Sequence, residues 1–287
     1  MSESVVLDAQ AKVNLFLRVL ATETSGYHGV ETLFCRIALA DRLEVRRLDE
    51  PGQVALEVRG AELGDPKQNL AYRAAQAVLD ATGRRFGVAI ELEKRIPMAA
   101  GLGGGSADAA ATLAAVNRLA GNAVPRAELA HLASRLGADV PFALSEAPLA
   151  LGWGHGERLL RLPPLPKAPG LLLVPPVGVA TADAYRWLDA AREGASPRGA
   201  VTYDLDVLSR WSDIARLAGN DFESVIFART PAVREGFDAL ARTQPMLCRM
   251  SGSGSTLFAV YRSARDRDDA QAMLGKKHGR VIATELG

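Results

Sequence analysis

Cysteine and histidine are scarce in this sequence. Its two cysteines, Cys35 and Cys248, are far apart and lie outside any metal-ligand spacing, so neither a disulfide framework nor a cysteine-built metal site is expected. The four histidines are scattered along the chain, which argues against a histidine cluster of the kind that holds zinc. The chemistry of the chain is therefore expected to depend on other residue types.

Excess charge and long apolar runs are also absent. The net charge is +1, so the chain as a whole has no broad attraction to nucleic acid or to a membrane surface. The apolar stretch 170–180 is interrupted by Pro175-Pro176 and is too short to span a bilayer. Charged Glu3 and Asp8 near the start argue against a secretory signal. We expect a cytoplasmic protein that binds neither nucleic acid nor membrane, and we infer no obligate protein partner.

Length and composition predict a two-lobed globular protein. The 287 residues, 48% of them hydrophobic, are enough for a large core, and domains cluster near ~100–150 residues. The clearest boundary is the proline-dense segment 162–169, because prolines at this density favour a stiff, extended connector. We therefore expect an N-terminal lobe over 1–163 and a C-terminal lobe over 164–287. Strands and helices without strict βαβ alternation predict an α+β fold.

Periodicity and stop signals predict the individual elements. For the N-terminal lobe we expect a hairpin over 149–162, helices over 70–82, from Ala107 onward and over 126–136, and strands over 13–20, 32–39, 41–48, 53–59 and 88–93. For the C-terminal lobe we expect strands over 171–174 and 257–261 and helices over 182–192, 205–218 and 231–242.

The most informative segment is a glycine loop between a predicted strand and a predicted helix. It runs Pro97-Met98-Ala99-Ala100-Gly101-Leu102-Gly103-Gly104-Gly105-Ser106. A glycine loop that opens a helix presents free backbone N–H groups and the positive end of the helix dipole, which predicts a phosphate site. Counting from Gly101, Ser106 and Ala107 stand where a P-loop has Gly-Lys, and a dinucleotide fingerprint would need a glycine at position 106. The sequence therefore predicts a phosphate loop of another kind.

Lys12 and Asp139 are candidates for phosphoryl transfer only in combination with this loop. Taken alone, Lys12 is a lysine on the strand face opposite an apolar stripe, beside Asn14, and Asp139 is a turn residue after a helix. Together, an aspartate can accept or orient a hydroxyl proton, while a lysine keeps that aspartate ionised and stabilises the attacking oxygen and the γ-phosphate. This hypothesis requires that the two side chains meet in the fold.

Five segments, in this order, resemble the GHMP small-molecule kinases. They are Ala11-Lys12-Val13-Asn14-Leu15-Phe16-Leu17, Gly26-Tyr27-His28, the glycine loop, Gly137-Ala138-Asp139-Val140-Pro141 and Ser251-Gly252-Ser253-Gly254. The similarity covers nearly the whole chain. It is most specific for the members that phosphorylate a cytidine-diphosphate-linked sugar alcohol in the non-mevalonate isoprenoid (MEP) pathway. It implies a two-lobed GHMP-kinase fold, with an N-terminal lobe like ribosomal protein S5 domain 2 and a C-terminal ferredoxin-like α/β sandwich.

The resemblance implies a nucleotide site around the glycine loop. ATP phosphates would lie on residues Pro97 to Ala107, with Lys94 and Asn69 near the nucleotide, although Asn69 also fits a plain helix N-cap. Mg²⁺ would be carried with ATP rather than held in a dedicated protein site. Because Ala107 has no hydroxyl, Ser106 is the loop hydroxyl that could assist the ion.

The resemblance implies catalytic and acceptor residues as well. Lys12 and Asp139 match the catalytic pair. The acceptor, a small molecule that carries a cytidine diphosphate group, would contact Asn14, Tyr27, His28, Thr181, Tyr185, Gly252 and Gly254. Tyr27 and His28 match a base-binding pair, since an aromatic ring can stack on cytosine while an imidazole bonds its edge. Tyr185 would close on the cytidine, although it also fits a core aromatic on an amphipathic helix.

Two alternatives remain open from sequence. A related GHMP kinase for homoserine or mevalonate would leave Tyr27 and His28 without a task. A nucleotide- or RNA-binding module would keep the loop without transferring phosphate, but the near-neutral charge and the presence of both Lys12 and Asp139 weigh against it. No function is predicted for His155, which we expect in an exposed turn.

Overall fold

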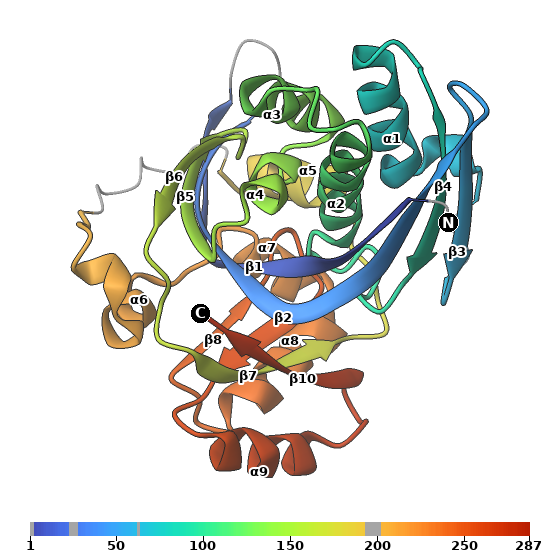
Figure 1. Cartoon of the computed structure of the whole chain (residues 1–287). Coiled ribbons are helices and arrows are strands. Elements are labelled where there is room, and N and C mark those ends of the chain that lie inside the picture. Colours follow the sequence, from blue (N-terminus) through green and yellow to red (C-terminus); the bar gives the residue numbers. More distant parts are fainter. Residues whose placement is uncertain (1–2, 23–27, 62–63, 193–201) are drawn as a thin grey trace.

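Two sheets form the framework of the protein and meet along one strand pair (Figure 1). The computed structural model describes residues 3–22, 28–61, 64–192 and 202–287. In the first sheet, the long strands β1 (Ser4–Thr22) and β2 (His28–Leu48) pair antiparallel. The other strands of this sheet are β3 (Val54–Arg59), β4 (Gly87–Glu93), β5 (Leu149–Gly154) and β6 (Arg158–Leu162). β4 and β5 pair with different parts of β2.

The second sheet is antiparallel throughout, with the strand order β10-β7-β9-β8. Its strands are β7 (Ala168–Val174), β8 (Leu247–Met250), β9 (Leu257–Val260) and β10 (Arg280–Leu286). Leu286 at the end of β10 pairs with Ile37 in β2, which joins the two sheets. The long β2 is therefore the element on which both halves of the chain are built.

The helices gather on both sides of this framework. On the N-terminal side lie α1 (Leu70–Ala81), α2 (Gly104–Leu119), α3 (Arg126–Leu136) and α4 (Val140–Ser145). The C-terminal half of the chain contributes α5 (Thr181–Arg192), α6 (Trp211–Leu217), α7 (Glu223–Arg229), α8 (Pro231–Ala241) and α9 (Ala264–Leu274). In Figure 1, α1 to α4 lie on one side of β2, and the orange and red C-terminal elements α8 and α9 lie on the other.

The alanine-rich helix α2 is the centre of the N-terminal core. Its side chains are buried nearly all round, which is the pattern of a helix enclosed by other elements. The small alanines let α2 pack closely between α1 and β1, in a core that also contains Leu43, Val78 and Ile90. This packing brings the first turn of α2, and the glycine loop before it, next to Lys12 of β1.

β1 carries side chains toward both lobes because its register is irregular. The pairing with β2 shifts between Gln10 and Lys12 and again between Asn14 and Phe16. Such shifts turn the strand locally and change which side chains share a face. As a result, Lys12 and Asn14 line the same cavity as Leu17. The strand face that carries Lys12 and Asn14 is buried, as is the apolar face that carries Val13 and Leu15.

Several elements differ from the sequence predictions. The strands predicted over 32–39 and 41–48 are one strand, β2, because Asp41 is buried and accepts backbone N–H groups from the end of β4 instead of ending the strand. The helix predicted from Ala107 begins at Gly104. The helix predicted over 205–218 is a 3₁₀ turn (Val207–Ser209) followed by α6. α4, α7, β8, α9 and β10 were not predicted.

The predicted lobe boundary falls between β6 and β7, where the chain passes from the first sheet to the second. One core cluster nevertheless contains Val13 and Leu15 together with Phe258 and Val260, so side chains from both proposed lobes pack together. The division into 1–163 and 164–287 stays a prediction. Within the described ranges, none of the helices has the length and apolar character that crossing a bilayer requires.

Candidate functional site

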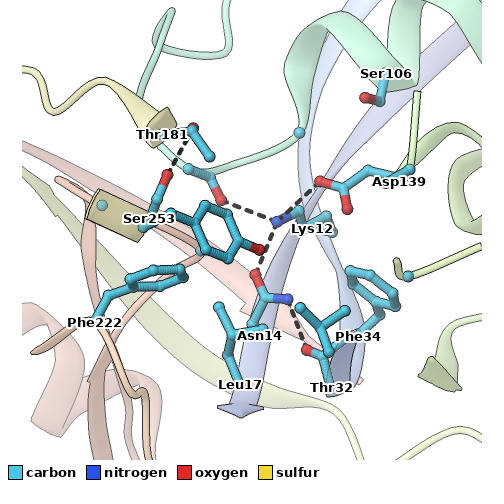
Figure 2. Close-up of a pocket in the computed structure, with 18 of the residues that line it drawn as sticks. Lys12, Asn14, Leu17, Thr32, Phe34, Ser106, Asp139, Thr181, Phe222 and Ser253 are labelled. Atoms are coloured by element: carbon cyan, nitrogen blue, oxygen red, sulfur yellow. Dashed lines mark hydrogen bonds and ion pairs between the residues drawn. The ribbon is translucent and has the colours of Figure 1, made fainter. Parts of the chain in front are cut away.

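The ammonium group of Lys12 is held by three acceptors at the wall of a cavity (Figure 2). Lys12 is 7% exposed, and its Nζ donates to Asn14 Oδ1 at 2.8 Å and to the carbonyl of Gly101 at 3.2 Å. Asn14 is fixed in turn, because its amide donates to Thr32 Oγ1 at 2.8 Å. These bonds fix the position of a cation next to the glycine loop.

Asp139 supplies the third partner of Lys12. Its Oδ2 lies 3.2 Å from Lys12 Nζ, and its side chain is 32% exposed. Asp139 stands at the N-terminal end of α4, but its carboxylate does not cap that helix. The side chain is therefore available to the cavity instead of serving as a turn former. The structure thus brings together the two residues that the sequence could pair only as a hypothesis.

The glycine loop passes between β4 and α2 and is packed so closely that side chains are excluded. Gly103 has a φ of 69° and stands at the N-cap position of α2, and a Cβ there would lie 3.1 Å from Lys12 Cε. Gly101, at a φ of 77°, is even more confined, since a Cβ would lie 2.2 Å from the carbonyl oxygen of Ser251. The first turn of α2 therefore lies next to Lys12, and a helix start beside a cation is an arrangement expected for an anion site.

A cavity of about 400 Å³ lies on one side of the loop. It contains nearly all the residues predicted for the nucleotide. Its lining includes Asn69, Lys94 and every residue from Pro97 to Ser106. Ala107 is buried in α2 and does not line it. Asn69 also caps α1, because its Oδ1 accepts the N–H of Ala71 at 2.8 Å, so its interpretation as a helix N-cap is confirmed and its contact with a nucleotide stays a prediction.

Lys94 is bound between two carboxylates in this cavity wall. Its Nζ donates to Asp41 and, at 2.6 Å, to Asp108 Oδ2, and the side chain is 5% exposed. Burial disfavours the charged form of Lys94 and acts to lower its pKa. The attraction and hydrogen bonds of the Asp108 and Asp41 carboxylates together have a larger effect, so the pKa of the Lys94 ammonium is raised. Lys94 therefore contributes to the cavity as part of a charged group of three residues rather than as a free cation.

Asp108 is expected to make folding stability fall as the pH rises toward neutrality. Burial raises the pKa of its carboxyl from an ordinary 3.8 to about 7. Between about pH 4 and pH 7 the folded chain therefore holds a proton that the unfolded chain has released. The stabilisation that comes from this proton is complete below the unfolded pKa and is lost as the pH rises through the folded pKa.

Urea unfolding of the wild type and of Asp108→Asn at several pH values between 5 and 8 measures this effect. The asparagine variant cannot titrate at this position. The unfolding free energy of the wild type, relative to the variant, is expected to decrease with rising pH. A difference that stays constant over this range would contradict the assignment of the raised pKa to Asp108.

A second cavity, of about 430 Å³, also borders the loop. Lys12, Asn14 and Asp139 line it, as do Thr181 and Tyr185 of α5. Gly252 and Gly254 contribute the backbone of the Ser-Gly-Ser-Gly segment. Four residues of the glycine loop region, Ala99, Gly101, Gly103 and Ser106, line both cavities. The loop is thus a shared wall, with the Lys12–Asp139 pair beside it.

Tyr185 and Phe222 line one end of the second cavity, its aromatic end, and His28 packs on Tyr185 without being one of the lining residues itself. His28 stacks on Tyr185, with ring centroids 4.8 Å apart, and Tyr185 meets the edge of Phe222 at 4.9 Å. His28 Nε2 lies 2.7 Å from Asp189 Oδ1. Burial, and then the charges of Asp139 and Asp189, raise the pKa of the Tyr185 hydroxyl, which keeps it neutral. Tyr27, predicted to act with His28, lies outside the described residues.

Several residues of the second cavity were not found from sequence. Phe34, Phe222 and Ser253 line it, and the hydroxyl of Ser253 lies 2.9 Å from that of Thr181 (Figure 2). His155 lies in an exposed turn after β5, as expected, and it also lines the cavity. No local motif marks Phe34 or Phe222, which tertiary structure brings to the cavity, whereas Ser253 lies within the Ser-Gly-Ser-Gly segment but was not named as a site residue. In the part of the chain that the structure describes, no group of three or more acidic, histidine or cysteine side chains could hold a metal ion.

Comparisons with known proteins agree with this geometry. The family model described as GHMP kinases N terminal domain matches residues 69–147, which include the glycine loop and Asp139. The model described as GHMP kinases C terminal matches residues 204–281. The solved structure of a homoserine kinase from Cytophaga hutchinsonii has a TM-score of 0.72 at 20% identity, over 99% of this chain and 95% of its own, which indicates a shared fold.

Relatives of higher identity are similar along nearly the whole chain. The 4-diphosphocytidyl-2-C-methyl-D-erythritol kinase of Pelotomaculum thermopropionicum is 40% identical over 282 residues, 96% of either chain. The kinase of the same name from Parvibaculum lavamentivorans is 38% identical and covers 97% of this chain and 96% of its own. A crystal structure of a 4-(cytidine 5'-diphospho)-2C-methyl-D-erythritol kinase has a TM-score of 0.81 at 36% identity, over 99% of both chains. The predicted α+β fold is confirmed, and the chain belongs to the GHMP kinases, in the family of the 4-diphosphocytidyl-2-C-methyl-D-erythritol kinases.

Proposed function

We propose that the protein transfers the γ-phosphoryl group of ATP to the 2-hydroxyl of 4-diphosphocytidyl-2-C-methyl-D-erythritol. The products are the 2-phosphate and ADP, in the non-mevalonate route to isoprenoid precursors. The observation that carries this proposal is the pair of cavities that share the glycine loop as a wall, with Lys12 and Asp139 at that wall. We further propose that the enzyme acts in the cytoplasm.

The nucleotide is assigned to the cavity that contains Asn69 and Lys94. N–H groups at the start of α2 would bind its phosphates, and the absence of side chains at Gly103 and Gly104 lets Lys12 and Ile96 pack closely against this helix start. Mg²⁺ would neutralise charge on the phosphates. Because the described residues contain no cluster of metal ligands, we propose that the ion enters with ATP and that Ser106, which lines both cavities, is its protein contact.

The acceptor is assigned to the cavity that contains Tyr185. Its cytosine would stack at the aromatic end, beside His28 and Tyr185, while its hydroxyl would lie near Asp139. Asp139 would take the hydroxyl proton as the oxygen bonds to phosphorus and the bond to ADP breaks. Lys12 would stabilise the negative charge on the transferring group, and no covalent enzyme intermediate is required.

Turnover with three acceptors tests the proposal. The purified protein is incubated with MgATP and, separately, with 4-diphosphocytidyl-2-C-methyl-D-erythritol, L-homoserine or mevalonate, and ADP release is measured. We expect turnover with the first acceptor alone, and background rates for the double variant Lys12→Ala, Asp139→Ala. Turnover of homoserine or mevalonate in its place would overturn the substrate, and rates no higher than those of the double variant would overturn the kinase.

The aromatic end of the cavity is expected to control acceptor affinity. Since stacking contributes about 1–3 kcal/mol per base, Tyr185→Leu should raise the acceptor KM by roughly 5- to 100-fold. The ATP KM should not change. His28→Ala and Tyr27→Ala should shift the same parameter. Tyr72→Leu, on α1 and outside both cavities, is the matched control. An acceptor KM that is insensitive to Tyr185 and His28 would place the base elsewhere.

A further inference from the structure

Asn220, between α6 and α7, has a buried side chain whose hydrogen-bonding groups are all used. It is 7% exposed. Its Nδ2 donates to two carbonyl oxygens, those of Met250 at 2.8 Å and Gly252 at 2.7 Å. Its Oδ1 accepts the N–H of Phe222 at 2.9 Å. One amide therefore fixes the Ser-Gly-Ser-Gly segment on one side and the start of α7 on the other.

The segment that Asn220 holds is in direct contact with the glycine loop. Ser251 Oγ donates to the carbonyl of Gly101 at 2.8 Å, and the N–H of Thr256 donates to the carbonyl of Ala100 at 3.3 Å. The carbonyl of Gly101 also accepts from Lys12 Nζ. A short chain of bonds thus runs from Asn220 through Ser251 and Gly101 to the ammonium of Lys12.

The backbone around Asn220 is bonded to the strand that carries Lys12. The N–H of Leu17 donates to the carbonyl of Gly219 at 2.8 Å, and the N–H of Asp221 donates to the carbonyl of Leu17 at 3.0 Å. The carboxylate of Asp221 accepts the N–H of Val19 at 2.8 Å. Residues 219–221 therefore hold β1, which carries Lys12 and Asn14. The same short stretch also holds the Ser-Gly-Ser-Gly segment.

We propose that Asn220 is a positioning residue for phosphoryl transfer, which sets the glycine loop and Lys12 relative to the acceptor cavity without touching either substrate. This inference rests on the proposed function. Local sequence does not reveal it, because Gly219-Asn220-Asp221 has the composition of an ordinary turn. The amide is needed as a double donor, since it binds the carbonyl of Met250 at the end of β8 and that of Gly252 within the Ser-Gly-Ser-Gly segment.

The test compares Asn220→Asp with Asn117→Asp. Asn117, in α2, is 4% exposed, and its amide also bonds backbone: Nδ2 donates to the carbonyl of Val124 at 3.1 Å, and Oδ1 accepts the N–H of Val124 at 2.9 Å. Asn117 lines neither cavity. In both variants the oxygen acceptor is retained and the amide donor is lost. The two variants are therefore matched in burial and in the kind of donor removed, although Asn220→Asp loses two bonds to carbonyls and Asn117→Asp loses one.

Asn220→Asp is expected to lower kcat by about 10²-fold, because a misplacement of 1 Å at a reacting centre can have an effect of that size. The acceptor KM should change little, since the bond to Phe222 and the aromatic end remain. Asn220→Ala, which loses that bond as well, should also raise the acceptor KM. Asn117→Asp should lower the melting temperature without changing kcat. Circular dichroism shows that each variant is folded at the assay temperature.

Equal kinetics for the two aspartate variants, both folded, would overturn the inference. If Asn220→Asp does not fold, Ser251→Ala is used instead, because it removes the bond from Ser251 Oγ to the carbonyl of Gly101. This variant should lower kcat by about 3- to 10-fold. An unchanged kcat would overturn the inference. If the wild type shows no turnover, the proposed function fails separately. The inference is then decided by titration with a non-hydrolysable ATP analogue, which Asn220→Asp must bind more weakly than Asn117→Asp.

Discussion

Asp139→Asn is expected to lower kcat by about 10³-fold, within the range that general acid–base catalysis supplies. Asparagine keeps the shape of the side chain but cannot accept the hydroxyl proton, and it removes the negative charge 3.2 Å from Lys12 Nζ. Both KM values should stay within a few-fold, since the lining of the two cavities is otherwise unchanged. Lys12→Met should cause a loss of similar size, because stabilisation of the transferring group is lost.

Stability should change little in Asp139→Asn, so the loss can be assigned to chemistry. The Asp139 side chain is 32% exposed, and a pair of that kind contributes about 1 kcal/mol or less. Lys12 keeps its bonds to Asn14 and to the carbonyl of Gly101. The measurements are ADP release and thermal melting, with Asp183→Asn, an exposed partner of Arg186 on α5, as the control. A variant that retains more than about a tenth of wild-type kcat would contradict a proton-accepting role.

Gly101→Ala is the second substitution with a large expected effect. The new methyl group would lie 2.2 Å from the carbonyl oxygen of Ser251 and 3.1 Å from that of Gly254. Both oxygens belong to the backbone, which cannot relieve the clash by rotating a side chain. The loop must move away from the Ser-Gly-Ser-Gly segment, which takes the carbonyl of Gly101 away from Lys12 Nζ. We expect kcat/KM for ATP to fall by about 10²-fold or more.

Gly121→Ala is the matched control for this substitution. Gly121 has a φ of 69°, close to the 77° of Gly101, but a Cβ there would meet nothing within 4 Å. Both variants therefore carry the same left-handed strain, about 1 kcal/mol, and only Gly101→Ala adds the collision. Steady-state kinetics and melting curves of the two variants separate strain from displacement. Equal loss of activity in both would mean that the contact with Ser251 is unimportant.

Local signals predicted the parts of the fold that depend on neighbouring residues. Asn69 marked the start of α1, and the glycine loop with its alanine-rich helix was recognised because both patterns lie within a few turns of chain. Short elements gave weaker signals, and α4 and β8 were missed. β2 was predicted as two strands with a break at position 40, but the strand continues through Asp41, whose carboxylate is bonded to N–H groups far away in sequence.

The site could be predicted only as a set of separate residues. Lys12 and Asp139 belong to distant segments, and their meeting depends on how α4 packs beside β1 rather than on either local sequence. Lys94 was predicted near the nucleotide, but its two carboxylate partners, Asp41 and Asp108, are brought to it by the sheet and by α2. Nothing in the sequence indicated that Asn220 has a role, because that role depends on the backbone carbonyls of Met250 and Gly252, which only the fold brings to it.

The shared wall between the two cavities has a thermodynamic consequence. Ala99, Gly101, Gly103 and Ser106 face both compartments, so any movement of the loop that one ligand favours also changes the other compartment. Affinities linked in this way are reciprocal: the factor by which nucleotide alters the affinity for the acceptor equals the factor by which acceptor alters the affinity for nucleotide. If nucleotide and acceptor occupy the two cavities as proposed, coupling between them would pass through this single stretch of backbone.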